Sequence, residues 1–213
     1  MTSPLKDTYS WFEPLYAKAD GDENQVPWAL PEAVPYLTQW IARTSADRLE
    51  KAGSRQSAVV VGCGLGNDAE ALAEAGFEVT AFDVADSAIA WAKQRFPSSN
   101  VNYVTADLFD LPSEWKHHFD VVFEFRTLQA LPISVRKEAI DQIAALAKPG
   151  GTLLLATYVR DSESVPDGPP WPLSEQELAW IEATGLEKIR EERFQKKESR
   201  FSDRVQIEYK KPQ

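Results

Sequence analysis

The stretch that decides the fold is Val59-Val60-Val61-Gly62-Cys63-Gly64-Leu65-Gly66-Asn67-Asp68. The valines predict the end of a buried strand, and Asn67 can cap a helix that runs to Ala75. The Gly-x-Gly-x-Gly loop between them lets backbone N–H groups approach a ligand closely, at the positive end of the helix. Its spacing differs from the Gly-x-Gly-x-x-Gly of dinucleotide sites, and a glycine turn without a ligand is the alternative interpretation.

Around this loop the chain alternates strands with helices, which predicts right-handed βαβ units and a parallel sheet. A terminal hairpin is expected from two further strands at Leu186–Phe194 and Arg204–Tyr209. The strands expected before it are Ala58–Val61, Glu78–Phe82, Val101–Ala106, Phe119–Phe125 and Thr152–Tyr158. The expected helices are Pro35–Ala52, Asn67–Ala75, Asp86–Phe96 (with Asp86 as its cap), Ile133–Lys148 and the segment from the capping box at Ser174 to about Thr184.

Residues 1–34 are rich in aromatic residues and prolines, and this pattern predicts no packed helix. The polar stretch Asp20–Gln25 is typical of a mobile loop. Trp11 and Trp28 either pack in the core or cover a ligand as part of a lid. We therefore expect a lid segment over residues 1–34 and a single domain over residues 35–213.

Two acids end the strands that follow the glycine loop. Asp83 stands seventeen residues after Gly66, where a carboxylate can accept both hydrogens of a ribose diol. Asp107 ends the next strand, where an adenine amino group could donate to it. Either acid alone could be a solvated turn residue. Ligands of open α/β sheets nevertheless bind at this carboxyl edge, so three adjacent strand ends predict a nucleoside site.

With these motifs, the sequence resembles a class I S-adenosylmethionine-dependent methyltransferase. The resemblance rests on VVVGCGLGND, VTAFDVADSAIAWAK, VTADLFDLP, FDVVFEFRTLQALP and AKPGGTLLL, and covers about residues 55–160. It implies a Rossmann-like, doubly wound sheet of seven strands, mostly parallel, with an antiparallel C-terminal strand. The residues that it implies as cofactor ligands are Trp11, Trp28, Gly62, Cys63, Gly64, Gly66, Asp68, Asp83, Val84, Asp107, Leu108 and Glu124.

Other features resemble the thiopurine and halide/thiol methyltransferase group. They are the aromatic N-terminus, Leu131-Pro132 with Arg136, and Gly168-Pro169-Pro170. Ala29 departs from the acidic residue that usually follows the N-terminal tryptophan, so the acceptor is less constrained than the cofactor. Arg126 could form an ion pair with Glu124 or hold an anionic acceptor.

The composition of the chain restricts the kinds of partner that it is expected to bind. Asp and Glu total 33 against 23 Lys and Arg, a net charge of -10, which argues against nucleic acid. No apolar run approaches the ~18 residues of a membrane span, and the first ten residues carry no secretory core, so we expect a cytoplasmic protein without an obligate protein partner. No third ligand accompanies His117-His118, so no metal is expected.

The sequence thus predicts methyl transfer from S-adenosylmethionine to a small-molecule acceptor, with a thiol or similar soft nucleophile favoured. The alternatives are O- or N-methylation of a small polar or aromatic metabolite, and a binding module without turnover. Because the sulfonium donor is already electrophilic, alignment and desolvation can suffice, and no general base is assigned. Cys63 lacks a neighbouring base in the sequence and is interpreted as a small packing residue rather than a nucleophile.

Overall fold

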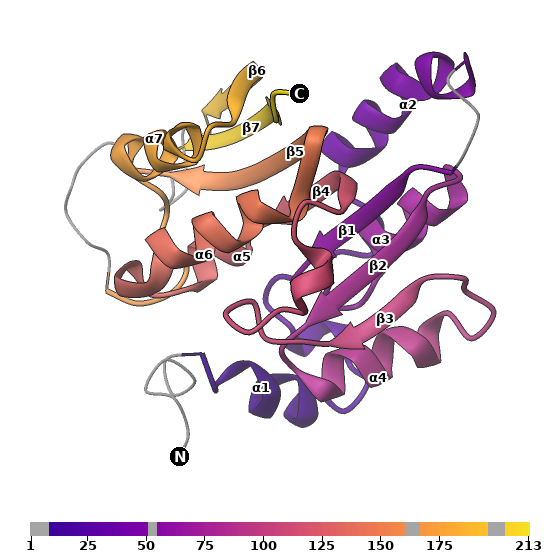
Figure 1. The fold of residues 1–213 in the computed structure, drawn as a ribbon. Coiled ribbons are helices and arrows are strands. Elements are labelled where there is room, and N and C mark those ends of the chain that lie inside the picture. Colours follow the sequence, from indigo (N-terminus) through magenta and orange to yellow (C-terminus); the bar gives the residue numbers. More distant parts are fainter. Residues whose placement is uncertain (1–8, 51–54, 161–166, 196–202) are drawn as a thin grey trace. The chain divides into compact units, whose positions relative to one another are not determined.

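The computed structural model describes residues 9–50, 55–160, 167–195 and 203–213. Its strands form a seven-stranded sheet in the order β3-β2-β1-β4-β5-β7-β6 (Figure 1). β1, β2 and β3 run parallel, as do β4 and β5, whereas β7 is antiparallel to both of its neighbours. This topology confirms the expected fold class. The strands are β1 (Ser57–Val61), β2 (Glu78–Asp83), β3 (Asn102–Thr105), β4 (Phe119–Phe125), β5 (Ala147–Val159), β6 (Glu187–Gln195) and β7 (Asp203–Lys210).

Two compact units make up the chain, and they divide after Asp107. The first contains Ser10–Asp107, with strands β1, β2 and β3, and we call it the glycine-loop unit. Its helices are α1 (Phe12–Ala19), η2 (Glu23–Gln25), α2 (Pro35–Glu50), α3 (Asn67–Glu74) and α4 (Asp86–Arg95). The expected boundary at residue 34 stays a prediction.

The N-terminal segment differs from expectation, because Phe12–Ala19 is an α-helix that packs on α4. Pro14 is the third residue of this helix. A proline there costs no intrahelical hydrogen bond, since the first four N–H groups of a helix have no internal partner. Within the stretch expected to be a loop, Glu23–Gln25 forms a short 3-10 helix capped by the Asp22 carboxylate, which accepts from the Asn24 N–H at 3.0 Å.

The second unit contains Leu108–Gln213 together with Tyr9, and we call it the hairpin unit. It holds strands β4 to β7 and the helices η3 (Ser113–Trp115), α5 (Thr127–Ala130), α6 (Ile133–Leu146) and α7 (Glu175–Ala183). The short helix α5 was not expected. The predicted C-terminal hairpin is confirmed as β6 and β7, although the turn joining them lies outside the described residues. The capping box at Ser174 is also confirmed, with both reciprocal hydrogen bonds formed.

Helix α6 ends at Leu146, two residues earlier than expected, and β5 then runs through Pro149-Gly150-Gly151. The last carbonyls of a helix lack internal donors. Here the backbone N–H groups of His117 and His118 donate to the carbonyls of Ala145 and Leu146, at 2.7 and 3.2 Å. The exposed histidine pair therefore supports a helix end. Among the described residues, no helix is long and apolar enough to cross a membrane.

Candidate functional site

The glycine loop follows β1 and adopts a backbone conformation that favours glycine. Gly62, Gly64 and Gly66 have φ angles of 60°, 50° and 91°. The Cys63 N–H donates to the Phe82 carbonyl at 2.9 Å, which fixes the loop against the end of β2. The loop therefore lies at the carboxyl edge of two neighbouring strands, the place where such sheets bind ligands.

Asp83 is tied to this loop through both carboxylate oxygens. Oδ2 accepts from the Gly64 N–H at 3.0 Å and Oδ1 from the Ala85 N–H at 3.1 Å. Burial raises the pKa of the Asp83 carboxyl, and these backbone hydrogen bonds oppose the rise. A carboxylate has about four lone-pair sites, so acceptor capacity remains for a ligand.

The end of β3 lies beside Asp83, since the Ala106 N–H donates to the Asp83 carbonyl at 3.0 Å. Asp107 therefore follows at the same edge of the sheet, and its side chain is half-buried. Val84 is also half-buried there, whereas Leu108 is buried and begins the hairpin unit. The structure thus brings the glycine loop, Asp83 and Asp107 to one edge of the glycine-loop unit.

The two caps expected in the glycine-loop unit, Asn67 and Asp86, are wrong. Gly66, not Asn67, is the N-cap of α3, and the Asn67 side chain instead donates to the Leu30 carbonyl at 2.6 Å. Asp86 is the first residue of α4 and not its cap. The α4 terminus is capped from another helix, because the Glu13 carboxylate accepts from the Ser87 N–H at 3.0 Å and from Ser87 Oγ at 2.5 Å.

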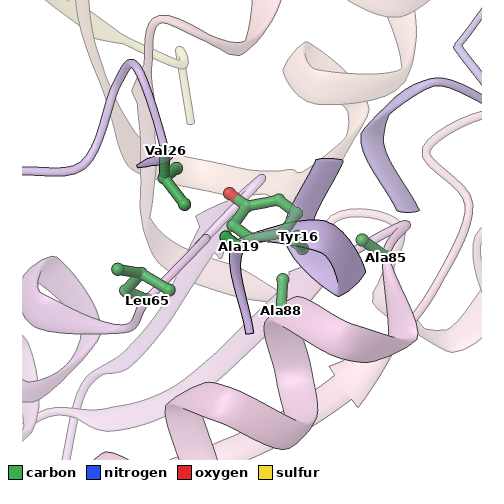
Figure 2. Packing of buried hydrophobic residues seen from close by; sticks show 6 residues of the cluster. All are labelled: Tyr16, Ala19, Val26, Leu65, Ala85 and Ala88. Atoms are coloured by element: carbon green, nitrogen blue, oxygen red, sulfur yellow. The ribbon is translucent and has the colours of Figure 1, made fainter. Parts of the chain in front are cut away.

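Aromatic side chains of the N-terminal segment gather over the glycine loop. Figure 2 shows the Tyr16 ring of α1 among Leu65 of the loop and Ala85 and Ala88 at the start of α4. Trp28 Nε1 donates to Tyr16 Oη at 2.7 Å, and the Trp11 and Trp28 ring centroids are 5.7 Å apart.

Tyr16 approaches the loop so closely that a Cβ on Gly64 would lie 3.0 Å from Tyr16 Oη. Sequence reasoning missed this residue, although its spacing of four from Phe12 on one helix face was a signal. Asp68 also anchors the segment, because its Oδ1 accepts from the Val34 N–H at 2.8 Å.

Cys63 is held as a thiol. Burial raises the pKa of its thiol well above the ordinary value, and the Asp83 carboxylate raises it further. A nucleophilic cysteine needs its pKa lowered by a nearby cation or base. These surroundings therefore favour the packing interpretation of Cys63.

Glu124, in the hairpin unit, is fully buried near the end of β4. Its Oε1 accepts from the Leu128 N–H at 3.0 Å, whereas Oε2 has no hydrogen-bond partner in the part of the chain that the structure describes. Burial raises the pKa of the Glu124 carboxyl to about 7, and the opposing charge comes from Arg136.

Arg126 follows β4 in a left-handed conformation, with φ of 65°. Its guanidinium lies over the Phe125 and Tyr158 rings, 4.5 and 5.3 Å from their centroids. Arg204, paired with Tyr158 across β7 and β5, lies 5.1 Å from the same Tyr158 centroid. Both guanidiniums donate to Tyr158 Oη, at 3.4 Å from Arg126 and 3.1 Å from Arg204, so two positive charges meet at the end of β5.

Sequence reasoning gave Arg136 no structural role, yet this side chain is fully buried. Arg136 Nη1 pairs with Glu177 Oε1 at 2.5 Å, and Arg160 pairs with Glu177 Oε2 at 2.6 Å. Arg136 also donates to the carbonyls of Leu128, Leu131 and Trp171. It therefore fixes the backbone after β4 and the segment before α7. Over the described ranges, no three His, Cys, Asp or Glu side chains form a potential metal site.

The sheet order, together with the glycine loop and Asp83, defines the class I methyltransferase fold. The sequence profile of the thiopurine S-methyltransferase family matches residues 20–208. The chain belongs to this family of S-adenosylmethionine-dependent methyltransferases, which confirms the resemblance seen in the sequence.

The curated proteins similar to this chain are named for methylation of different acceptor atoms. A ubiquinone biosynthesis O-methyltransferase of Nitrosospira multiformis is 38% identical over 106 residues, 49% of this chain and 44% of that protein. A thiopurine S-methyltransferase of Legionella pneumophila is 35% identical over 96 residues, 45% of this chain and 42% of that protein. The matched regions thus span less than half of each relative.

Among solved structures, the N-methyltransferase NodS from Bradyrhizobium japonicum, in complex with S-adenosyl-L-homocysteine, has the same fold. The TM-score is 0.68 at 21% identity, over 97% of this chain and 99% of that one. At this identity the likeness supports the fold alone.

Proposed function

We propose that this protein transfers a methyl group from S-adenosylmethionine to the sulfur of a small-molecule thiol. The observation that carries the cofactor assignment is the glycine loop joined to Asp83 at the sheet edge. A Cβ on Gly64 would crowd Tyr16 Oη at 3.0 Å, so the loop backbone and the Tyr16 side chain approach each other closely. The residues present therefore fit a nucleoside bearing an amino-acid tail.

In this proposal Gly62, Cys63, Gly64 and Gly66 present backbone groups to the amino-acid tail, with Asp68 at the following helix. Asp83 and Val84 hold the ribose and Asp107 holds adenine, and the family resemblance adds Leu108 and Glu124 to the expected cofactor residues. When bound, S-adenosylmethionine supplies an electrophilic methyl group on a sulfonium. Trp11 and Trp28 exclude water as part of a lid formed by the segment before residue 35, and an aromatic face also attracts a cation by ~0.5–2 kcal/mol.

We assign the binding of the methyl acceptor to Arg126, Tyr158 and Arg204. Two guanidiniums meeting at one phenol favour a negatively charged group nearby. A thiol with an ordinary pKa near ~8.5 would ionise more readily beside them. Arg126 and Arg204 thus hold the acceptor as a thiolate, and no residue need act as a general base.

O-methylation is the second candidate, because one similar protein is a ubiquinone O-methyltransferase. Incubation with S-adenosylmethionine and matched panels of aromatic thiols and phenols separates the two. Mass spectrometry should find methyl thioethers, whereas methyl ethers alone would support the second candidate. Binding of adenosylhomocysteine without any product would indicate a binding module.

The cofactor assignment is tested by Asp83→Asn. Adenosylhomocysteine affinity should weaken by ~2–3 kcal/mol, because charge-assisted hydrogen bonds to the ribose are lost. Asp86→Asn is the matched control, since Asp86 is exposed three residues further along the chain. Titration calorimetry measures both. Equal affinities for the two variants would remove Asp83 from the site.

A further inference from the structure

Arg95, the last residue of α4, joins three parts of the glycine-loop unit. Its Nη1 donates to the Leu65 carbonyl at 2.6 Å and to Asn67 Oδ1 at 2.9 Å. Its Nε pairs with Glu23 Oε1 at 3.0 Å, with 19% of the Arg95 side chain exposed. One guanidinium therefore links the glycine loop, the start of α3 and the N-terminal segment.

The N-terminal segment is attached to the same place a second time. Asn67, which accepts from Arg95, donates through Nδ2 to the Leu30 carbonyl at 2.6 Å. Glu23 and Leu30 lie on either side of Trp28. The part of the segment proposed to cover the cofactor is thus held at both ends through Arg95, directly at Glu23 and through Asn67 at Leu30.

The contact with Leu65 reaches the backbone of the loop itself. A peptide group is planar, so the carbonyl of Leu65 and the N–H of Gly66 turn together. Arg95 holds the carbonyl side of this plane, and the Gly66 N–H donates to the Cys63 carbonyl at 3.0 Å. Fixing Arg95 therefore fixes the peptide plane between two of the glycines of the proposed cradle.

We propose that Arg95 is a positioning residue that couples docking of the N-terminal segment to the conformation of the glycine loop. This proposal rests on the proposed function, because the loop is taken to bind the cofactor. Coupling of this kind is reciprocal. A docked segment favours the binding-competent loop, and cofactor binding favours the docked segment.

The test is a double-mutant cycle with Arg95→Gln and Glu23→Gln. Adenosylhomocysteine affinity, measured by titration calorimetry, should fall about threefold for Glu23→Gln and at least tenfold for Arg95→Gln. The double variant should bind no more weakly than Arg95→Gln alone, since both substitutions break one linkage. Arg95→Lys keeps the charge but not the forked donors, so it should recover only part of the affinity.

A second readout follows the segment without any ligand. Hydrogen exchange of the α1 amides should be faster in both single variants than in the wild-type chain, and adenosylhomocysteine should slow it in the wild type. A merely structural role for Arg95 would lower the melting temperature without changing exchange at α1 selectively. Lys93→Gln, an exposed position on the same helix, is the control and should change neither affinity nor exchange.

Failures of the two proposals look different. If the wild-type chain does not bind adenosylhomocysteine, the proposed function fails, and exchange at α1 still decides whether Arg95 holds the segment. If the wild type binds and Arg95→Gln binds equally well, the coupling is refuted. Effects of the two substitutions that simply multiply would show that Arg95 and Glu23 act independently, which also refutes it.

Discussion

The glycine-loop unit and the hairpin unit use different means to place their functional groups. In the glycine-loop unit, backbone groups position the site. The Gly64 N–H donates to the Asp83 carboxylate, and the Gly66 N–H donates to the Cys63 carbonyl within the loop. In the hairpin unit buried charged side chains do it, with Arg136 paired to Glu177 and donating to three carbonyls. A loop built from backbone groups is sensitive to a change of shape, whereas a buried ion pair is sensitive to the loss of either partner.

The largest effect is expected for Arg136→Ala, which should lower the free energy of unfolding by ~3–5 kcal/mol. Removing one partner leaves Glu177 buried beside an incomplete set of partners. The neighbouring Lys137→Ala breaks only an exposed pair with Asp141 and should cost at most ~0.5 kcal/mol. Urea melts measure both. Similar losses for the two variants would contradict the proposed reliance of the hairpin unit on buried charge.

Glu124→Gln should change how stability depends on pH. The carboxyl has a pKa of about 7 in the folded protein and an ordinary value near ~4.3 when unfolded. Between these values the folded state binds the proton more strongly, so the free energy of unfolding falls as pH rises. Glutamine does not titrate, so this pH dependence is absent from the variant. The free energy of unfolding of Glu124→Gln should therefore rise by ~3 kcal/mol relative to that of the wild type between about pH 4.5 and pH 7.

The measurement for Glu124 is a series of urea melts across that pH range. Glu138→Gln, on the exposed face of α6, supplies the control and should run parallel to the wild type. A Glu124→Gln profile that also runs parallel would mean that the buried carboxyl does not titrate in this window.

Substitutions that add a side-chain atom without changing the charge test the glycine loop. A Cβ on Gly66 would lie 2.4 Å from Tyr103 Oη, whereas one on Gly76 has nothing within 4 Å, and the φ angles are 91° and 90°. Gly76→Ala therefore measures backbone strain alone, ~1–2 kcal/mol. Gly66→Ala should cost ~1–3 kcal/mol more by thermal melts, because it adds overpacking. Tyr103→Phe should recover part of that difference, and no recovery would place the cost elsewhere.

The same contrast explains what the sequence could predict. The glycine loop and Asp83 were predictable because their meaning lies in a few adjacent residues and in strand ends. Arg136 and Glu177 are separated by 41 positions, so no local sequence pattern could predict their ion pair. Helix α1 was missed because Pro14 was taken to exclude a helix, although it stands in the first turn, where it is tolerated. The capping of α4 was missed because Glu13 lies 74 positions before Ser87, whose N–H donates to its carboxylate.

The buried pair of Arg136 and Glu177 also bears on how readily this enzyme could acquire new acceptors. Arg204 is exposed and Arg126 and Tyr158 are half-buried, and none of the three carries the fully buried contacts that Arg136 and Glu177 make. Exchanging these three residues should cost little folding stability, so mutagenesis libraries can vary them freely while Arg136 and Glu177 are kept. Because the residues that stabilise the fold differ from those proposed to bind the acceptor, this scaffold is well suited to directed evolution toward other methyl acceptors.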